Sequence, residues 1–87
     1  MTDVQILEKV KRFLKERGTK YNIESLKYLG IKENEKLIDG TLVAMHIVSY
    51  DIESDAADGK TFFISLDANT DKFIYLVTPN RIIDIDE

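Results

Sequence analysis

The feature that most constrains the fold of this chain is the shortness of the connections in its second half. After Gly40 the sequence consists of apolar, β-branched runs interrupted only by "SDAADG", "ANT" and "PN". Each interruption has turn chemistry, as in Asp58-Gly59 or Pro79-Asn80. Because such short connections join antiparallel neighbours, the pattern predicts a four-stranded antiparallel β-meander. The strands are expected over residues 41–53, 60–67, 72–78 and 81–86.

The beginning of the chain has a helical period instead. Thr2 and Gln5 form a capping box, Met1 is placed for a hydrophobic staple, and Gly18 can supply a left-handed exit. An amphipathic helix is therefore predicted over residues 3–17. Its apolar stripe consists of Ile6, Leu7, Val10, Phe13 and Leu14.

Residues 22–30 admit two interpretations. Asn22 can cap a second, short helix and Gly30 can end it. A strand over residues 26–29 is the competing interpretation. The charged stretch "KENEK", residues 32–36, is expected to be a solvated connection.

These elements predict a single α+β domain over residues 1–87, with the N-terminal helix packed on the four-stranded meander. One helix followed by an antiparallel meander resembles the cystatin-like arrangement. The stretch "FFISLDANTDKFIYL" is similar in rhythm to the hairpin of PepSY-type modules, with Asp71-Lys72 where such hairpins usually carry a Gly. This resemblance concerns shape and implies no function.

Hairpin register assigns residues to the two faces of the sheet. A two-residue turn at Pro79-Asn80 pairs Leu76 with Ile83, and a three-residue loop at 68–70 pairs Ile64 with Ile74. We choose the three-residue loop because a four-residue loop would mix the faces. The inward face then holds Ala44, Val48, Tyr50, Ile52, Phe62, Ile64, Leu66, Ile74, Leu76, Ile83 and Ile85.

The opposite, outer face is also apolar, although one helix covers only one side of a sheet. One interpretation is that residues 22–38 fold over it, or that it is the ordinary surface of a small sheet. The other is a partner surface with an acidic rim, which prefers a basic partner or a second copy of the chain. Its apolar residues are Val43, Met45, Ile47, Phe63, Phe73, Tyr75, Val77 and Ile82, and its acids are Asp51, Glu53, Asp67, Asp84 and Asp86.

Charge is distributed unevenly along the chain. Residues 1–36 carry nine Lys+Arg and six Asp+Glu, whereas residues 37–87 carry three and ten, which gives +3, −7 and a net −4. The acidic part would repel a polyanion, and Glu8 and Glu16 interrupt the basic face of the helix. A protein partner is therefore expected rather than nucleic acid, with phosphate binding by the helix as a distant alternative.

The stretch "SLDANTDKF" places oxygen donors at alternate positions, as a calcium loop does. Asp67, Asn69 and Asp71 fill the first three ligand positions, but Lys72 replaces the required Gly and Thr78 the terminal Glu. Asp and Asn also serve tight hairpins, because their side chains bond nearby backbone amides. We therefore expect a turn, and neither a metal site nor a cofactor.

His46 is the only histidine, and its parity places it on the inward face. A general base needs an orienting acid and a substrate cavity, and zinc needs more ligands than one His in a chain without Cys. The expected role of His46 is a hydrogen-bonded position at the margin of the core. The alternative is a small-ligand or hydrolytic site between helix and sheet.

The sequence thus favours a small, non-enzymatic binding domain of the inhibitor, immunity or adaptor type. The absence of Cys fits a reducing compartment, and the charged start resembles neither a signal peptide nor a membrane span, so a cytoplasmic protein is expected. The predicted partner-binding residues are Phe63, Phe73, Tyr75 and Ile82 at the centre, with Asp51, Asp84 and Asp86 on the rim.

Overall fold

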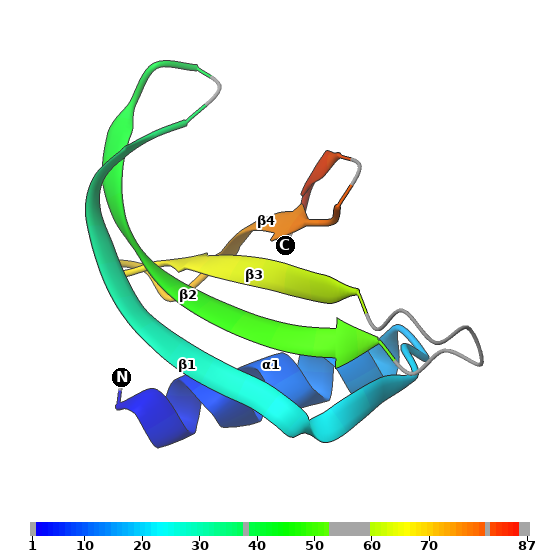
Figure 1. The fold of residues 1–87 in the computed structure, drawn as a ribbon. Helices are drawn as coiled ribbons and strands as arrows, with labels where there is room; N and C mark the ends of the chain where they lie inside the picture. The colour runs from blue at the N-terminus through cyan, green and yellow to red at the C-terminus, as the bar shows by residue number, and fades with distance from the viewer. Residues whose placement is uncertain (1, 38, 53–59, 80, 86–87) are drawn as a thin grey trace.

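The fold consists of one helix against one antiparallel sheet. The computed structural model describes residues 2–37, 39–52, 60–79 and 81–85. The helix α1 lies along one face of a sheet with strand order β1-β2-β3-β4-β5 (Figure 1). The α+β class is confirmed, with five strands instead of four. The elements are α1 (Asp3–Glu16), β1 (Tyr21–Lys36), β2 (Leu42–Ile52), β3 (Thr61–Asp67), β4 (Phe73–Val77) and β5 (Ile82–Asp84).

Both ends of α1 are fixed by the predicted chemistry. Thr2 Oγ1 accepts a hydrogen bond from the Gln5 backbone at 3.3 Å, and Gln5 Oε1 accepts one from the Thr2 backbone at 2.9 Å. Gly18 follows the helix with φ +67°, and the Thr19 amide donates to the Leu14 carbonyl, which completes a Schellman motif. The proposed staple partner Met1 lies outside the described residues. No helix in the described part of the chain is long and apolar enough to cross a membrane.

The core lies between α1 and the face of the sheet that carries the even-numbered residues of β2. Ile6, Val10 and Leu14 of α1 are almost fully buried. Burial of side chains of this size stabilises a fold by about 1.5–3 kcal/mol each, so this stripe holds the helix in place. The sheet residues of the buried cluster are Val48, Tyr50, Ile64, Leu66, Phe73 and Leu76.

Residues 21–36 form a strand. The predicted short helix over 22–30 is therefore wrong, the competing strand over 26–29 is confirmed, and the predicted connection over 32–36 is wrong. Asn22 Oδ1 accepts from the Glu24 amide at 3.0 Å, and Gly30 takes φ +109°. Both features coincide with breaks in the pairing of β1 with β2. The side-chain chemistry expected to cap a helix therefore forms β-bulges in a long edge strand.

The hairpin between β3 and β4 also differs from the predicted one. The Asp67 amide donates to the Lys72 carbonyl at 2.8 Å, which closes a four-residue loop with Asp71 at φ +61°. A four-residue loop exchanges the two faces of the sheet for the residues next to it, as expected. Phe73 consequently pairs with Leu66, and its side chain points into the core. An irregularity in the pairing at Ile74 then restores the predicted parity for the rest of β4.

In the pairings of β2 with β3 and of β4 with β5, the side chains lie on the faces of the sheet that the sequence predicts. Leu76 pairs with Ile83 as expected, and the Thr78 amide donates to the Arg81 carbonyl across the turn. The apolar pattern also predicts that Val48 pairs with Leu66. In the structure Val48 lies opposite Ile64, so the pairing of β2 with β3 is shifted by two residues. A shift of two leaves every side chain on its expected face.

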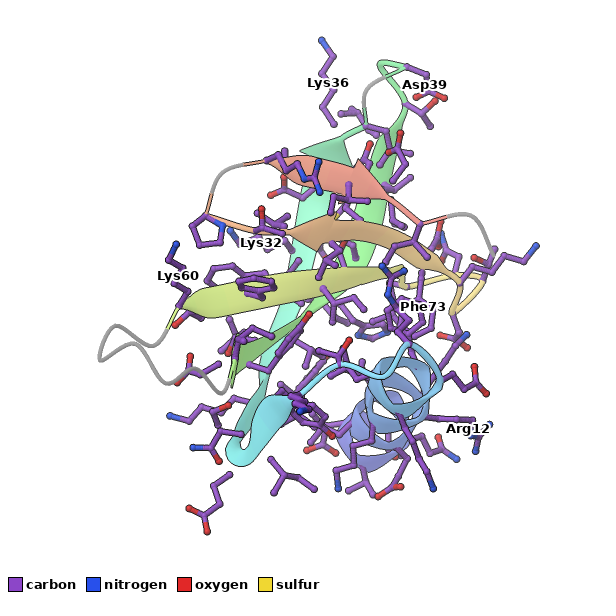
Figure 2. The ribbon with its side chains drawn as sticks, turned by 90° about the vertical axis from the view of Figure 1, so that its right-hand side faces the viewer. Arg12, Lys32, Lys36, Asp39, Lys60 and Phe73 are labelled. Carbon is purple, nitrogen blue, oxygen red and sulfur yellow. The ribbon has the colours of Figure 1, made fainter. Side chains whose placement is uncertain are left out.

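The long strands β1 and β2 curve away from α1 and form an arm beyond the end of β3. The tip of this arm, which carries Asp39, lies at the opposite end of the molecule from Arg12 on α1 (Figure 2). It bends over the side of the sheet that α1 leaves uncovered (Figure 1). Residues 22–36 therefore extend the sheet at its edge as part of β1, and the tip of the arm bends over the outer face.

Phe73 provides a direct test of the revised register. It is 8% exposed, and Figure 2 shows it beside α1. Its ring lies 4.4 Å from the Phe13 ring of α1, centroid to centroid. We expect Phe73→Ala to lower the free energy of unfolding by about 3–5 kcal/mol. The matched variant Phe63→Ala, at a ring that is 37% exposed, should lose no more than about 1 kcal/mol. Urea unfolding measures both; equal losses would contradict this placement of Phe73.

Tyr50 makes the stability depend on pH above the neutral range. Burial raises the pKa of its hydroxyl from 10.0 to about 12, although the charge of Arg17 opposes this shift. The unfolded chain therefore loses this proton first as the pH rises, so the stabilisation is complete below about pH 10 and is lost towards pH 12. We expect the free energy of unfolding to fall by roughly 1–3 kcal/mol over this interval. Tyr50→Phe should show a visibly smaller fall, and identical pH profiles would refute the assignment.

Candidate binding face

The register places two neighbouring rows of side chains on the outer face of the sheet. Side chains in one row come from adjacent strands, so they lie side by side about 5 Å apart. One row contains Ile47, Ser65, Tyr75 and Asp84, and the other contains Ser49, Phe63, Val77 and Ile82.

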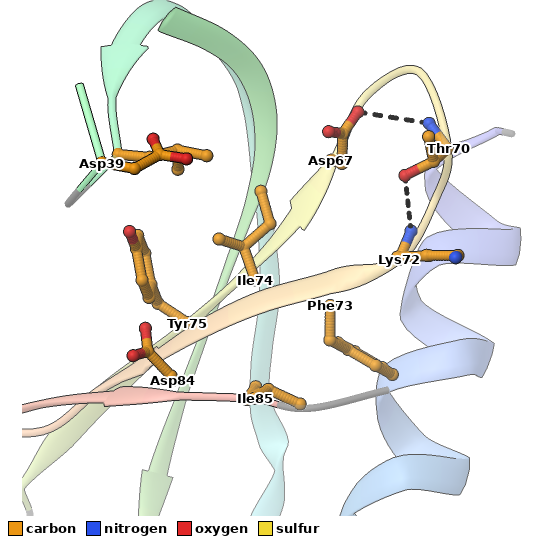
Figure 3. A pocket seen from close by; sticks show the side chains of 10 residues that line it. Asp39, Asp67, Thr70, Lys72, Phe73, Ile74, Tyr75, Asp84 and Ile85 are labelled. Atoms are coloured by element: carbon orange, nitrogen blue, oxygen red, sulfur yellow. Dashed lines mark hydrogen bonds between the residues drawn. The ribbon is translucent and has the colours of Figure 1, made fainter. Parts of the chain in front are cut away.

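The first hollow on this face, here called the acidic cleft, has a volume of about 500 Å³. The tip of the arm, the β3–β4 turn and the strands β4 and β5 surround it (Figure 3). Tyr75 lies between Asp39 and Asp84 in this view, with the aromatic ring facing the cleft (Figure 3). The lining residues are Leu37, Asp39, Asp67, Thr70, Lys72, Phe73, Ile74, Tyr75, Asp84 and Ile85.

Two carboxylates of the acidic cleft, those of Asp39 and Asp67, are held by local hydrogen bonds. Asp39 Oδ1 accepts from the Thr41 amide at 2.9 Å; this bond and one with the Thr41 side chain lower the pKa of Asp39 below its ordinary 3.8. Asp67 Oδ1 accepts from the Asn69 and Thr70 amides at 2.7 and 3.2 Å. With Asp84 and Lys72, the described lining carries three acids and one base, a formal charge of −2. The cleft therefore attracts cations.

The second hollow, here called the apolar hollow, adjoins the acidic cleft on the same face. Its volume is about 270 Å³, and Phe63 and Leu29 in its wall are 37% and 54% exposed. Gly30 contributes open space, since a side-chain carbon there would meet nothing within 4 Å. The lining residues are Leu29, Gly30, Lys32, Ile47, Phe63 and Val77.

Less apolar area is accessible on the outer face than the sequence predicts, because Met45 is buried there and Phe73 belongs to the core. Met45, Ser49 and Ser65 lie on this face but are buried within the fold. Ser65 Oγ bonds to the Tyr75 backbone and helps to hold β4 against β3. The accessible apolar area is therefore concentrated at the apolar hollow and at Ile82, which is 61% exposed.

The structure brings together only part of the predicted site. Phe63, Tyr75, Ile82 and Asp84 occupy neighbouring positions on the outer face. Phe73 does not belong with them, because the four-residue loop turns its ring into the core.

The two other predicted rim acids are placed differently. Asp51 lies in the next row of the outer face, opposite Thr61 and two positions along β2 from Ser49, which pairs with Phe63. It accepts a hydrogen bond from the Thr61 hydroxyl at 2.7 Å. Asp86 lies outside the described residues.

Several residues of the two hollows were not predicted. Asp39 and Leu37 come from the arm tip, and Leu29, Gly30 and Lys32 come from β1. These contributions follow from the pairing of residues 21–36 with β2. The sequence favours a short helix or a strand over 26–29 for part of this segment and a solvated connection over 32–36. The β-branched and aromatic residues of this segment, Tyr21, Ile23, Tyr28 and Ile31, are the signal that favours a strand.

The stretch "SLDANTDKF", whose oxygen donors resemble those of a calcium loop, forms a turn, as the sequence predicts. Asp67 uses its carboxylate to bind two amides of its own loop, and Thr70 Oγ1 accepts from the Lys72 amide at 3.4 Å (Figure 3). Within the residues that the structure describes, no three His, Asp or Glu side chains converge as metal ligands do.

His46 lies at the margin of the core, on the inward side of β2, and is buried. A hydrogen bond of 2.9 Å joins its Nδ1 to the Tyr28 hydroxyl of β1, and the two rings are 5.7 Å apart. This contact ties the edge strand to the centre of the sheet. It also occupies one of the two nitrogens that a general base would use.

The cationic residues of α1 are partly engaged in structural contacts. Lys9 Nζ donates to the Asp71 carbonyl and lies 5.0 Å from the centre of the Phe73 ring. Lys11 forms an ion pair with Glu8 at 3.5 Å. Lys9 therefore ties α1 to the β3–β4 turn, and Lys11 pairs with a neighbouring residue of the same helix.

Comparison with protein-family models, with curated proteins and with solved structures finds no match to this chain.

The contact between Tyr28 and His46 predicts a measurable loss of stability. Tyr28→Phe leaves a buried imidazole nitrogen without its partner, which typically costs about 1–3 kcal/mol. Tyr21→Phe is the matched control on the same strand, since the described contact of Tyr21 is between its ring and that of Tyr50. Thermal unfolding of both variants tests this expectation, and a loss as small for Tyr28→Phe as for the control would contradict it.

Proposed function

We propose that this chain is a small, non-enzymatic protein-binding domain that holds a partner on the outer face of its sheet. An inhibitor, an immunity-type protein or an adaptor would each use such a face. The observation that carries the proposal is the adjacency of the acidic cleft and the apolar hollow on the side that α1 leaves uncovered. An apolar centre beside charged groups is the usual composition of a protein interface.

The exposed side chains give this face a reason to bind. Phe63 and Leu29 line the apolar hollow and Ile82 lies beside Val77, one of its walls. Covering apolar surface is favourable by about 25 cal/mol per Å². The aromatic rings of Phe63 and Tyr75 are of the types that dominate interface energetics.

The charges select the kind of partner. Asp39, Asp67 and Asp84 line the acidic cleft, and Lys72 offsets only one of them. A partner segment with Lys or Arg complements this charge, whereas an acidic segment or a nucleic-acid backbone is repelled. Self-association is the competing occupant, since the cationic surface of α1 could meet the cleft of a second copy.

A ligand or hydrolytic site around His46 finds less support. The residue is buried and bonded to Tyr28, and it lines neither of the two hollows described above. We further propose a cytoplasmic location, which the absence of Cys supports. The cystatin-like outline, with α1 across an antiparallel sheet, remains an interpretation of shape and suggests no partner.

Selection of binders from a random-peptide display library tests the proposal directly. We expect the enriched peptides to combine Lys or Arg with apolar residues and to bind more weakly as the salt concentration rises. Ile82→Ser should weaken them by about tenfold or more, which corresponds to 1.4 kcal/mol.

Val4→Ser is the matched control, because Val4 on α1 is 62% exposed and Ile82 is 61% exposed. The proposal fails if the enriched peptides show no positive charge, or if both variants bind them equally well. Sedimentation of the free protein at several concentrations tests self-association. A mass that rises to that of a dimer would identify a second copy as the occupant.

A further inference from the structure

The two hollows meet along a single strand. Tyr75 lines the acidic cleft and Val77 lines the apolar hollow. These residues are two positions apart on β4 and point to the same face, because they pair with Ser65 and Phe63 of β3. Residues so related lie about 6.5 Å apart.

The apolar hollow has the dimensions and lining for one apolar side chain. Its volume of about 270 Å³ lies below the range of about 300–1,000 Å³ typical of sites for whole small ligands. Gly30 keeps it open, since its φ of +109° disfavours any residue with a side chain there. Lys32 in its wall disfavours a second cation at this position.

The acidic cleft is suited to a cationic side chain. Tyr75 offers an aromatic ring between Asp39 and Asp84, which come from different parts of the chain (Figure 3). A guanidinium group can stack on such a ring while it bonds to a carboxylate, so Arg satisfies this arrangement better than Lys.

We infer that the partner crosses the outer face as an extended segment, with an apolar side chain in the hollow and an Arg or Lys two positions away in the cleft. In an extended chain, residues two apart point to the same side and lie about 6.5 Å apart, which matches Tyr75 and Val77. Adjacent residues point to opposite sides, so they cannot fill both hollows. The inference rests on the proposed function and specifies the pattern that the face recognises.

Synthetic peptides of equal composition test the spacing. In Thr-Thr-Leu-Thr-Arg-Thr-Thr the two key residues are two positions apart, and in Thr-Thr-Leu-Arg-Thr-Thr-Thr they are adjacent. The Thr residues favour an extended backbone in both peptides. Titration of the isotope-labelled full chain, followed by NMR, reports both the Kd and the amides that are affected.

The first peptide is expected to bind about tenfold more tightly and to shift the amides of Gly30, Tyr75 and Val77. Replacement of its Arg by Glu, or Asp84→Asn in the protein, should remove most of this advantage. Glu16→Gln, an exposed change on α1, should preserve it. Equal affinities of the two peptides at these amides would overturn the spacing and leave the proposed function standing.

Two other outcomes are equally decisive. If neither synthetic peptide shifts these amides but library-selected peptides do, the inferred pattern is wrong and the face is still a binding face. If library-selected peptides also leave them unchanged, the inference and the proposed function fall together.

Discussion

One helix can cover only one face of a sheet, and this constraint determines where a partner can bind this chain. The stripe of Ile6, Val10 and Leu14 is buried against β2, β3 and β4, so the core is complete on that side. The opposite face is covered only in part: Met45, Ser49 and Ser65 are buried there, and the tip of the arm bends over it (Figure 1). Side chains such as Phe63 and Ile82 consequently remain accessible there.

The shape of the outer face follows from irregularities in strand pairing. Bulges in β1 allow a long edge strand to curve, and they also protect its free edge from pairing with other chains. The arm thereby brings Asp39 to a cleft whose other walls come from β4 and β5. Gly30, at one of these bulges, keeps the adjoining hollow open. The irregular backbone of β1 thus contributes to both hollows on the outer face of the sheet.

Much of the fold could be predicted because its determinants are local. The caps of α1 at Thr2 and Gly18 and the pairing of Leu76 with Ile83 depend on neighbouring residues alone. The identity of β1 could not be obtained in this way, because Asn22 and Gly30 serve a helix boundary and a β-bulge equally well. Only pairing with β2, which is remote in sequence, decides between them.

The candidate site was predictable to a similar degree. Alternation along β3, β4 and β5 placed Phe63, Tyr75, Ile82 and Asp84 on one face. The predicted direction of Phe73 is wrong because one extra residue in the β3–β4 loop reverses it. Asp71 makes this longer loop possible, since Asp tolerates the positive φ of +61° that it adopts there. Asp39 was missed because its proximity to Tyr75 results from the bend of the arm and leaves no mark in the sequence.

The central claim is that the apolar hollow and Ile82, on the outer face of the sheet, are open to solvent. Broadening of methyl NMR signals by a soluble gadolinium chelate tests it most directly. The methyl groups of Leu29 and Ile82 should broaden as strongly as those of Val4, while Val48 and Ile64 should stay sharp. Leu29 and Ile82 signals as protected as those of Ile64 would show that this face is already covered, and would contradict the account.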